Sequence, residues 1–251
     1  MKSSKEAAIS RALSTSIGLN APLIDFKAFL RSQGALIKCV VSSALFKTQI
    51  AVNSHDMHSQ AVQFSLTPEF EVKFDNGIRL TAIGRLLSQA VDGLEPVDND
   101  LEAYSPASRP GLLSPNTEFE LREFFFEMAI GEDYLTLGKQ QVVWGKADGL
   151  KVLDVVNPQS FREFILADFE DSRIPLWTVN YEWKLGDNSN LQVLWIPDQS
   201  MHALPERNAT YAFTSSRLVP SAPLGVNVKL GAVDRPSRVI SDSDFGFDFG
   251  C

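Results

Sequence analysis

The stretch 177–185 constrains the fold most strongly, because its side chains alternate without a fault between apolar and polar types. Its apolar side consists of Trp177, Val179, Tyr181, Trp183 and Leu185, and its other side consists of Thr, Asn, Glu and Lys. A period of two is the pattern of a β-strand with one apolar and one polar face. The three aromatic rings predict that the apolar face is wide and strongly hydrophobic.

Other strands are predicted in pairs joined by tight turns. The pairs are 62–74 with 78–87, 117–130 with 133–144, and 177–186 with 190–197. The first pair is joined by Asp75-Asn76-Gly77, where Asn and Gly tolerate the positive φ that hairpin turns need. In the strand 117–130 the alternation changes phase near Arg122–Glu123, which indicates a β-bulge. The fold class predicted from these patterns is all-β and antiparallel.

Long polar segments separate the predicted pairs, at 88–116, 145–176 and 198–242. Short turns that alternate with long loops are typical of a transmembrane β-barrel of the outer membrane. A soluble β-sandwich can show the same order, and it stays open as an alternative. No apolar run approaches the roughly 18 residues of a membrane-spanning helix, which excludes helical spans but not spanning strands.

The charge balance and the few histidines and cysteines narrow the function classes. The chain has 31 acidic and 23 basic side chains, a formal net charge of -8, and no cluster of Lys and Arg. Nucleic acid is therefore not an expected partner. The two cysteines and three histidines show no metal-ligand spacing, so neither a metal site nor a cofactor is predicted.

The segment 145–176 carries the candidate functional residues. Asn157 followed by Pro158 predicts a helix start, with a short helix at about 158–167. Two interpretations stay open: a folded external loop, or a loop that folds into a barrel lumen and forms a constriction of mixed charge. The candidate constriction residues are Lys146, Asp148, Asp154, Arg162, Asp168, Asp171 and Arg173.

The N-terminal segment 1–43 is predicted to be a leader outside the barrel. Residues 1–33 carry a short amphipathic helical pattern, and residues 34–46 are similar to the apolar core of a signal peptide, although Lys38 interrupts it. We interpret 1–43 as an unassigned leader with a degenerate signal region. Residues 44–251 are interpreted as the N-terminal part of a barrel.

Several sequence motifs carry a family resemblance. The core GKQQVVWGKADG is followed by DVVNP, REF and DSRIP, and LTAIGR, LQVLWIPDQ and RPSRVISDSDFG lie on either side. These motifs resemble the DUF1302 family of Gram-negative outer-membrane proteins over about 44–249. Within the motifs Trp144, Gly145, Asn157, Pro158 and Pro175 are expected to be structural residues, not solute ligands.

The resemblance implies an outer-membrane β-barrel with a porin-like role in the passage or uptake of small hydrophobic or aromatic compounds. The expected partners are outer-membrane lipid, an unidentified solute, and periplasmic or inner-membrane transport proteins. Family members are longer, so the chain is expected to be an incomplete barrel. No enzymatic activity is predicted. The alternatives are a soluble carbohydrate-binding module and a glycoside hydrolase built on the carboxylates of 145–176.

Overall fold

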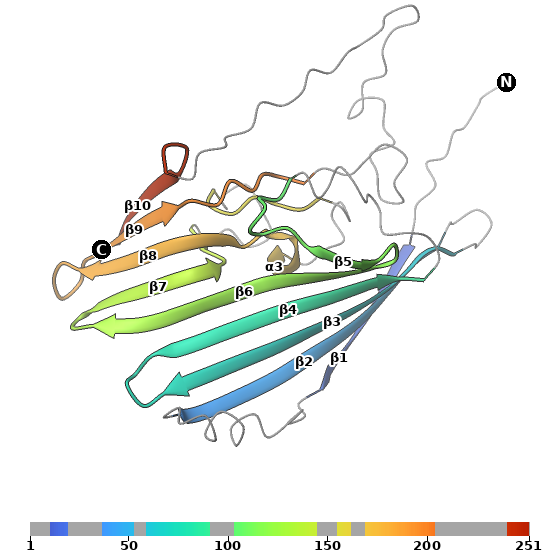
Figure 1. Cartoon of the computed structure of the whole chain (residues 1–251), viewed down its shortest axis with the longest axis horizontal. Coiled ribbons are helices and arrows are strands. Elements are labelled where there is room, and N and C mark those ends of the chain that lie inside the picture. The colour runs from blue at the N-terminus through green and yellow to red at the C-terminus, as the bar shows by residue number, and fades with distance from the viewer. Residues whose placement is uncertain are drawn as a thin grey trace, which may run out of the picture. The chain divides into compact units, whose positions relative to one another are not determined.

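A computed structural model describes the protein over residues 11–19, 37–52, 59–90, 103–144, 155–161, 169–203 and 240–250. These residues form antiparallel strands, as predicted, and one short helix (Figure 1). The chain divides into two compact units. The first comprises Met1–Val97 with Arg109–Ala129, and the second comprises Asp98–Ser108 with Ile130–Cys251.

The first unit is an antiparallel sheet in the strand order β1-β2-β3-β4-β6, with β5 paired to β6. Its strands are β1 (Arg11–Leu19), β2 (Ile37–Val52), β3 (Ser59–Phe74), β4 (Arg79–Gln89), β5 (Gly111–Ser114) and β6 (Thr117–Ile130), the last belonging to this unit up to Ala129. Neighbours in sequence are neighbours in the sheet from β1 to β4 (Figure 1). Each connection there is consequently a hairpin connection.

The predicted tight turn between β3 and β4 is confirmed. Gly77 has a φ of 86°, and the side-chain oxygen of Asn76 accepts a hydrogen bond of 3.1 Å from the amide of Ile78. The amide of Phe74 donates 2.9 Å to the carbonyl of Ile78, which closes the hairpin. Glycine is needed at position 77 because a side chain disfavours positive φ.

The predicted bulge in β6 is also confirmed. Ile83 of β4 pairs with Glu123, but the next residue, Gly84, pairs with Leu121, so Arg122 is the extra residue. Gly84 is suited to this position because a Cβ atom there would lie 3.1 Å from the ring of Phe119. The bulge shifts the alternation by one residue, which keeps the glutamates on both sides of it on one face of the sheet.

The second unit is an antiparallel sheet in the order β7-β8-β9-β10. Its elements are β7 (Asp133–Gln140), α3 (Phe169–Ser172), β8 (Leu176–Lys184), β9 (Asn190–Ile196) and β10 (Asp244–Gly250). Two clusters of buried apolar residues stabilise it. One contains Ala103, Tyr104, Ile174 and Ala203, and the other contains Val142, Leu176, Leu194 and Ile196.

Some local predictions differ from the structure, and strand β5 lies within 88–116, which the sequence predicts to be a loop. Residues 11–19 form strand β1, not part of a helix, because each of them pairs with a residue of β2 from Arg11↔Val52 to Leu19↔Ala44. This backbone pairing overrides a weak local helical pattern. The strand predicted over 133–144 ends at Gln140, so Trp144 lies beyond its end. Strand β1 and the start of β2 fall within the segment 1–43, whose role as a leader stays a prediction.

Candidate functional site

The two faces of the first unit are best seen in β6. Glu118, Glu120 and Arg122 are 1%, 1% and 6% exposed, whereas Phe119 and Leu121 between them are 43% and 36% exposed. This first half of the strand therefore buries its charged side chains and exposes its apolar ones. This distribution is the reverse of that in a water-soluble sheet, where burial of apolar area is the main stabilising term.

The same two faces extend over the neighbouring strands, although Val41 and Leu45 on the polar side of β2 are also exposed. We call the side that carries Glu120 the polar face of the unit, and the opposite side the apolar face. The described register places these exposed residues on the apolar face: Ile50, Phe64, Leu66, Phe119 and Leu121. The rings of Phe46 and Phe64 stack there, with centroids 6.4 Å apart.

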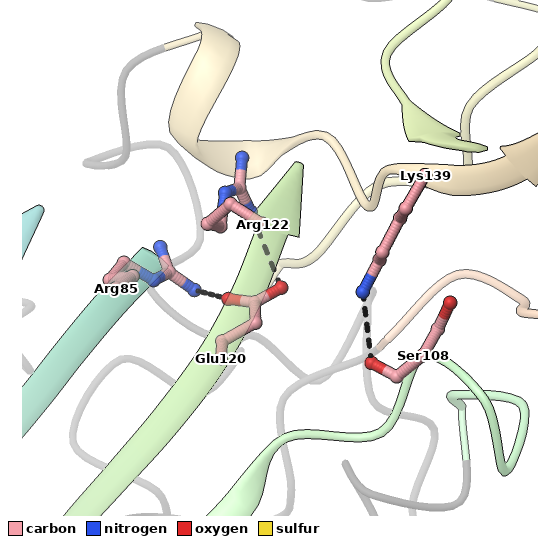
Figure 2. Close-up of polar contacts among 5 residues, drawn as sticks. All are labelled: Arg85, Ser108, Glu120, Arg122 and Lys139. Atoms are coloured by element: carbon pink, nitrogen blue, oxygen red, sulfur yellow. Dashed lines mark hydrogen bonds and ion pairs between the residues drawn. The ribbon is translucent and has the colours of Figure 1, made fainter. Parts of the chain in front are cut away.

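A buried charge cluster occupies the polar face between β4 and β6. Arg85 donates a hydrogen bond of 2.7 Å to one carboxylate oxygen of Glu120, and Arg122 lies 3.6 Å from the other oxygen (Figure 2). Two guanidinium groups thus approach one carboxylate that water barely reaches. Opposite charges in such a setting interact far more strongly than at a surface.

A second charge cluster on this face is more exposed. Arg79 lies 3.6 Å from Glu71 and 3.4 Å from Glu127, and Lys73 lies 2.8 Å from Glu71. The side chains of Arg79 and Glu127 are more than a third exposed. Water screens these pairs, so they contribute little to stability.

The second unit repeats the two faces, except that the buried Lys139 pairs with Trp177 and so lies on the apolar side. In β8 Thr178 and Asn180 are buried, while Trp183 is exposed, and in β10 Phe245, Phe247 and Phe249 are exposed. Register places these phenylalanines on the same side as Val179 and Tyr181, because Val179 pairs with Trp195 and Trp195 pairs with Phe245. The side of Thr178 and Asn180 is the polar face of this unit.

Uncharged side chains form two separate sets of hydrogen bonds on the polar face of the second unit. Gln140 donates 2.7 Å to the hydroxyl of Thr178, and Gln192 donates 3.0 Å to the side-chain oxygen of Asn180. Trp144 donates 2.6 Å from its indole nitrogen to the side-chain oxygen of Gln192. Trp144 therefore lies against the polar face, although it is one of the chain's largest apolar side chains.

The Trp144 ring packs closely against Gly246 on this face. A Cβ atom at residue 246 would lie 2.5 Å from Cη2 of the indole, so only glycine admits the ring in its present position. Gly246 pairs with Leu194, which belongs to a local apolar patch on the polar face. Trp144 and Val156 pack against this patch. The chain that leaves β7 thus turns across the polar face of its own sheet.

Asn157 has a different role from the predicted helix cap. Its side-chain oxygen accepts a hydrogen bond of 3.3 Å from the amide of Val142, and its side-chain nitrogen donates 2.6 Å to the carbonyl of Val142. The residues after it are extended: Gln159 bridges Arg173, and Ser160 bridges Ala203. The predicted helix start at Asn157–Pro158 is therefore wrong. The helix of this segment that the structure describes is α3.

Three short segments form a small ladder beside β8. The amide of Ser160 donates a hydrogen bond of 2.7 Å to the carbonyl of Ser172. The amide of Ile174 donates one of 2.8 Å to the carbonyl of Pro158. On the other side, Phe161 donates 2.8 Å to the carbonyl of Ala203. Side chains add to the ladder, because Nδ1 of His202 accepts a hydrogen bond of 2.9 Å from the amide of Gln159.

Asp198 organises the turn at 103–108. One of its carboxylate oxygens accepts hydrogen bonds from the hydroxyl of Ser108 and the amide of Trp177, and the other accepts from the amide and hydroxyl of Ser200. Lys139, which is 1% exposed, donates 3.2 Å to the carbonyl of Ser108 (Figure 2). The turn is thereby fixed against the ends of β7 and β8.

The structure places six of the predicted site residues. Arg173 is buried in the ladder, Asp171 is half-buried in α3, Pro158 and Pro175 are buried, and Trp144 and Asn157 have the contacts given above. The others lie outside the described residues: Gly145, Lys146, Asp148, Asp154, Arg162 and Asp168. The charged constriction as a whole therefore stays a prediction.

The buried charges of the sheets were missed by the sequence analysis. These residues are the buried Glu118, Glu120, Arg122, Lys139 and Asp198, together with the half-buried Arg85. A signal for three of them was present, since Glu118, Glu120 and Arg122 alternate with Phe119 and Leu121. Such alternation shows which residues share a face, but it does not show which face is buried.

Within the described ranges, no helix is long and apolar enough to cross a membrane, and no group of three or more His, Cys, Asp or Glu side chains is arranged to hold a metal ion. The resemblance to the DUF1302 family stays a prediction. In comparisons with known proteins, no family model, no curated protein and no solved structure matches this chain.

Proposed function

We propose that this chain supplies membrane-spanning strands of an outer-membrane, porin-like β-barrel. In this proposal the apolar face of each unit contacts lipid, and the polar face lines a passage for small hydrophobic or aromatic compounds. Gram-negative outer membrane is the proposed location. The protein acts by binding and passage, without catalysis.

The burial pattern of β6 is the observation that carries this proposal. Exposing Phe119 and Leu121 to water is unfavourable by roughly 25 cal/mol for each Å² of apolar surface, and burying Glu118 and Glu120 costs still more unless they are paired. Contact with lipid removes the cost of exposing Phe119 and Leu121, because acyl chains solvate apolar side chains. A polar lumen lowers the cost of placing Glu118 and Glu120 on the other face. Alternating apolar-out and polar-in residues are the pattern of spanning strands.

The strand lengths of the first unit agree with the proposal. A tilted spanning strand needs roughly 9–11 residues. Strands β2 and β3 have 16 residues each, β4 has 11 and β6 has 14. Sequential hairpins without crossing connections, as in β1 to β4, are also the connectivity of such barrels.

The contacts at the start of 145–176 favour a lumenal course for that segment over an external loop. Trp144 lies on the polar face of the second unit, and Val156 packs on the same apolar patch. Because this face lines the passage in the proposal, Trp144 and Val156 both lie at the lumen wall. The choice of hydrophobic or aromatic solutes rests on the family resemblance alone.

A soluble carbohydrate-binding module is the alternative function. Such modules present a few aromatic rings at one site, and the phenylalanines of β10 could serve that role. The first unit, taken by itself, also exposes apolar residues on β2, β3 and β6, and these are aliphatic as well as aromatic. A wide apolar surface of this kind is better explained by lipid than by a sugar.

Fluorescence quenching in vesicles tests the proposal. A variant whose only tryptophan is Trp183 is reconstituted with lipids brominated in their acyl chains. We expect strong quenching by the brominated lipid and weak quenching by aqueous iodide. The matched control is a variant without native tryptophans that carries Glu182→Trp, the neighbouring residue on the opposite face. The control should show the reverse order. Quenching of Trp183 by iodide alone would rule out the lipid-facing assignment.

A further inference from the structure

Trp144 differs from the other three tryptophans of the chain in the face that it occupies. The alternation of β8 and its pairing with β9 place Trp177, Trp183 and Trp195 on the apolar face. Trp144 lies on the polar face, where it donates a hydrogen bond to Gln192. A large ring on the lumen wall needs a separate explanation, because the lipid does not account for it.

The position of this ring is fixed from three directions. Gln192 holds the indole nitrogen, and Gln192 is itself held by Asn180. Beneath the ring, Gly246 leaves the space that any larger residue would fill. Next to it, Asn157 fixes the backbone of Val142, two residues before the tryptophan. A side chain supported in this way keeps one orientation.

We propose that the Trp144 indole is a residue that limits solute size in the passage, standing on the lumen wall where Gly246 and Gln192 hold it. This inference rests on the proposed function and adds to it one specificity-determining side chain. The ring carries no formal charge, so it restricts solutes by size. It therefore differs from the charged residues predicted for 145–176, which would act on ion preference.

The first experiment locates the ring. A variant whose only tryptophan is Trp144 is reconstituted in vesicles and compared with the variant that keeps only Trp183. We expect iodide to quench the fluorescence of Trp144 and brominated acyl chains not to quench it. For Trp183 we expect the opposite result. Adding Gly246→Ala should move the ring and shift its emission maximum, whereas Phe247→Leu, the neighbouring change on the apolar face, should not.

The second experiment measures passage. Vesicles that contain an intact barrel carrying this sequence are placed in isotonic solutions of neutral sugars of increasing size, and their swelling rate is recorded. Trp144→Ala should raise the swelling rate severalfold for the largest sugars that still enter, without a change in cation or anion preference. Trp144→Phe keeps a smaller ring and should give an intermediate rate. A large dextran should stay excluded in each case. If vesicles with Trp144→Ala also admit dextran, that variant has a damaged barrel. The test then depends on the swelling rate of the Trp144→Phe variant, which should exceed that of the wild type for the largest sugars that still enter.

The outcomes separate this inference from the function on which it rests. If brominated lipid fails to quench Trp183, the membrane function itself is wrong. If Trp183 is quenched but brominated lipid also quenches Trp144, or iodide does not, the lumenal position of Trp144 is wrong. Equal swelling rates for the wild type, Trp144→Ala and Trp144→Phe would overturn its role in passage.

Discussion

Arg85 and Glu120 lie on neighbouring strands and are joined by a hydrogen bond of 2.7 Å, with the carboxylate only 1% exposed. Register alone brings them together, since Arg85 pairs directly with Glu120 across β4 and β6. Arg122, the bulged residue, reaches the second oxygen of the same carboxylate at 3.6 Å. Regular alternation already puts Arg122 on the face of Glu120, and the bulge brings Glu123 onto that face as well, opposite Ile83.

The first prediction concerns the charge of Glu120. Glu120→Gln keeps the shape of the side chain but leaves the buried Arg122 and the half-buried Arg85 without their shared negative charge. Breaking a buried pair in this way costs roughly 3–5 kcal/mol. We expect a loss of that order in the free energy of unfolding, measured by denaturant titration of the protein in lipid vesicles.

Glu127→Gln is the matched control, because Glu127 is on the same strand and face and also contacts an arginine. Its pair with Arg79 is more than a third exposed on both sides. An exposed pair contributes about 0–1 kcal/mol, so this change should be nearly neutral. Similar losses for the two variants would mean that the Arg85–Glu120–Arg122 cluster is not desolvated.

The second prediction concerns the apolar face of β8. Val179→Arg places a charge on the face proposed to contact lipid, and this costs roughly 2–4 kcal/mol near the middle of a bilayer. Glu182→Gln, on the opposite face, should change the free energy of unfolding little. Both values come from the same titration in vesicles. Equal tolerance at the two positions would contradict a membrane-facing surface.

The strands could be predicted from the sequence because their signal is local. Alternation of side chains sets the strand, and Asn76 and Gly77 set the turn. The phase change near Arg122 revealed the bulge for the same reason. What alternation could not provide was the choice between burying the charged face and burying the apolar face, since that choice depends on the surrounding medium.

The contacts of 145–176 could not be predicted because they join residues that are distant in sequence. Asn followed by Pro is a sound helix start, but an asparagine side chain can equally pair with a backbone. Here it pairs with Val142, 15 residues earlier. Likewise, nothing near Trp144 in the sequence indicates that Gly246 will lie beneath its ring.

The third prediction tests the observed role of Asn157. Asn157→Asp would preserve a helix cap, because Asp caps as well as Asn does. A carboxylate cannot donate to the carbonyl of Val142, however, so a buried acceptor loses its partner, at a cost of about 1–3 kcal/mol. We expect that loss in the free energy of unfolding and faster amide exchange near Val142. An Asn157→Asp variant with an unchanged free energy of unfolding would favour the capping role instead.

The last prediction concerns Arg173 and Asp171, the two predicted constriction residues whose charges the structure describes. Arg173 is buried beside Gln159 in the ladder, and Asp171 is half-buried in α3. If this part of the chain lines the passage, the two charges act on permeant ions in opposite directions. Arg173→Ala should shift the preference toward cations, and Asp171→Ala should shift it toward anions. The measurement is the reversal potential of planar bilayers that contain an intact barrel carrying this sequence, under a salt gradient.

Lys184→Ala is the control for these two variants, because it also removes one charge but lies at the tight-turn end of β8, where it pairs with the exposed Glu132. Water and salt screen a charge at that position, so the reversal potential should not change. Opposite shifts for Arg173→Ala and Asp171→Ala, with none for Lys184→Ala, would place the segment in the passage. Unchanged ion preference in all three variants would show that 145–176 is an external loop. In that case Trp144 alone, held on the polar face by Gln192, would remain as the residue that narrows the passage.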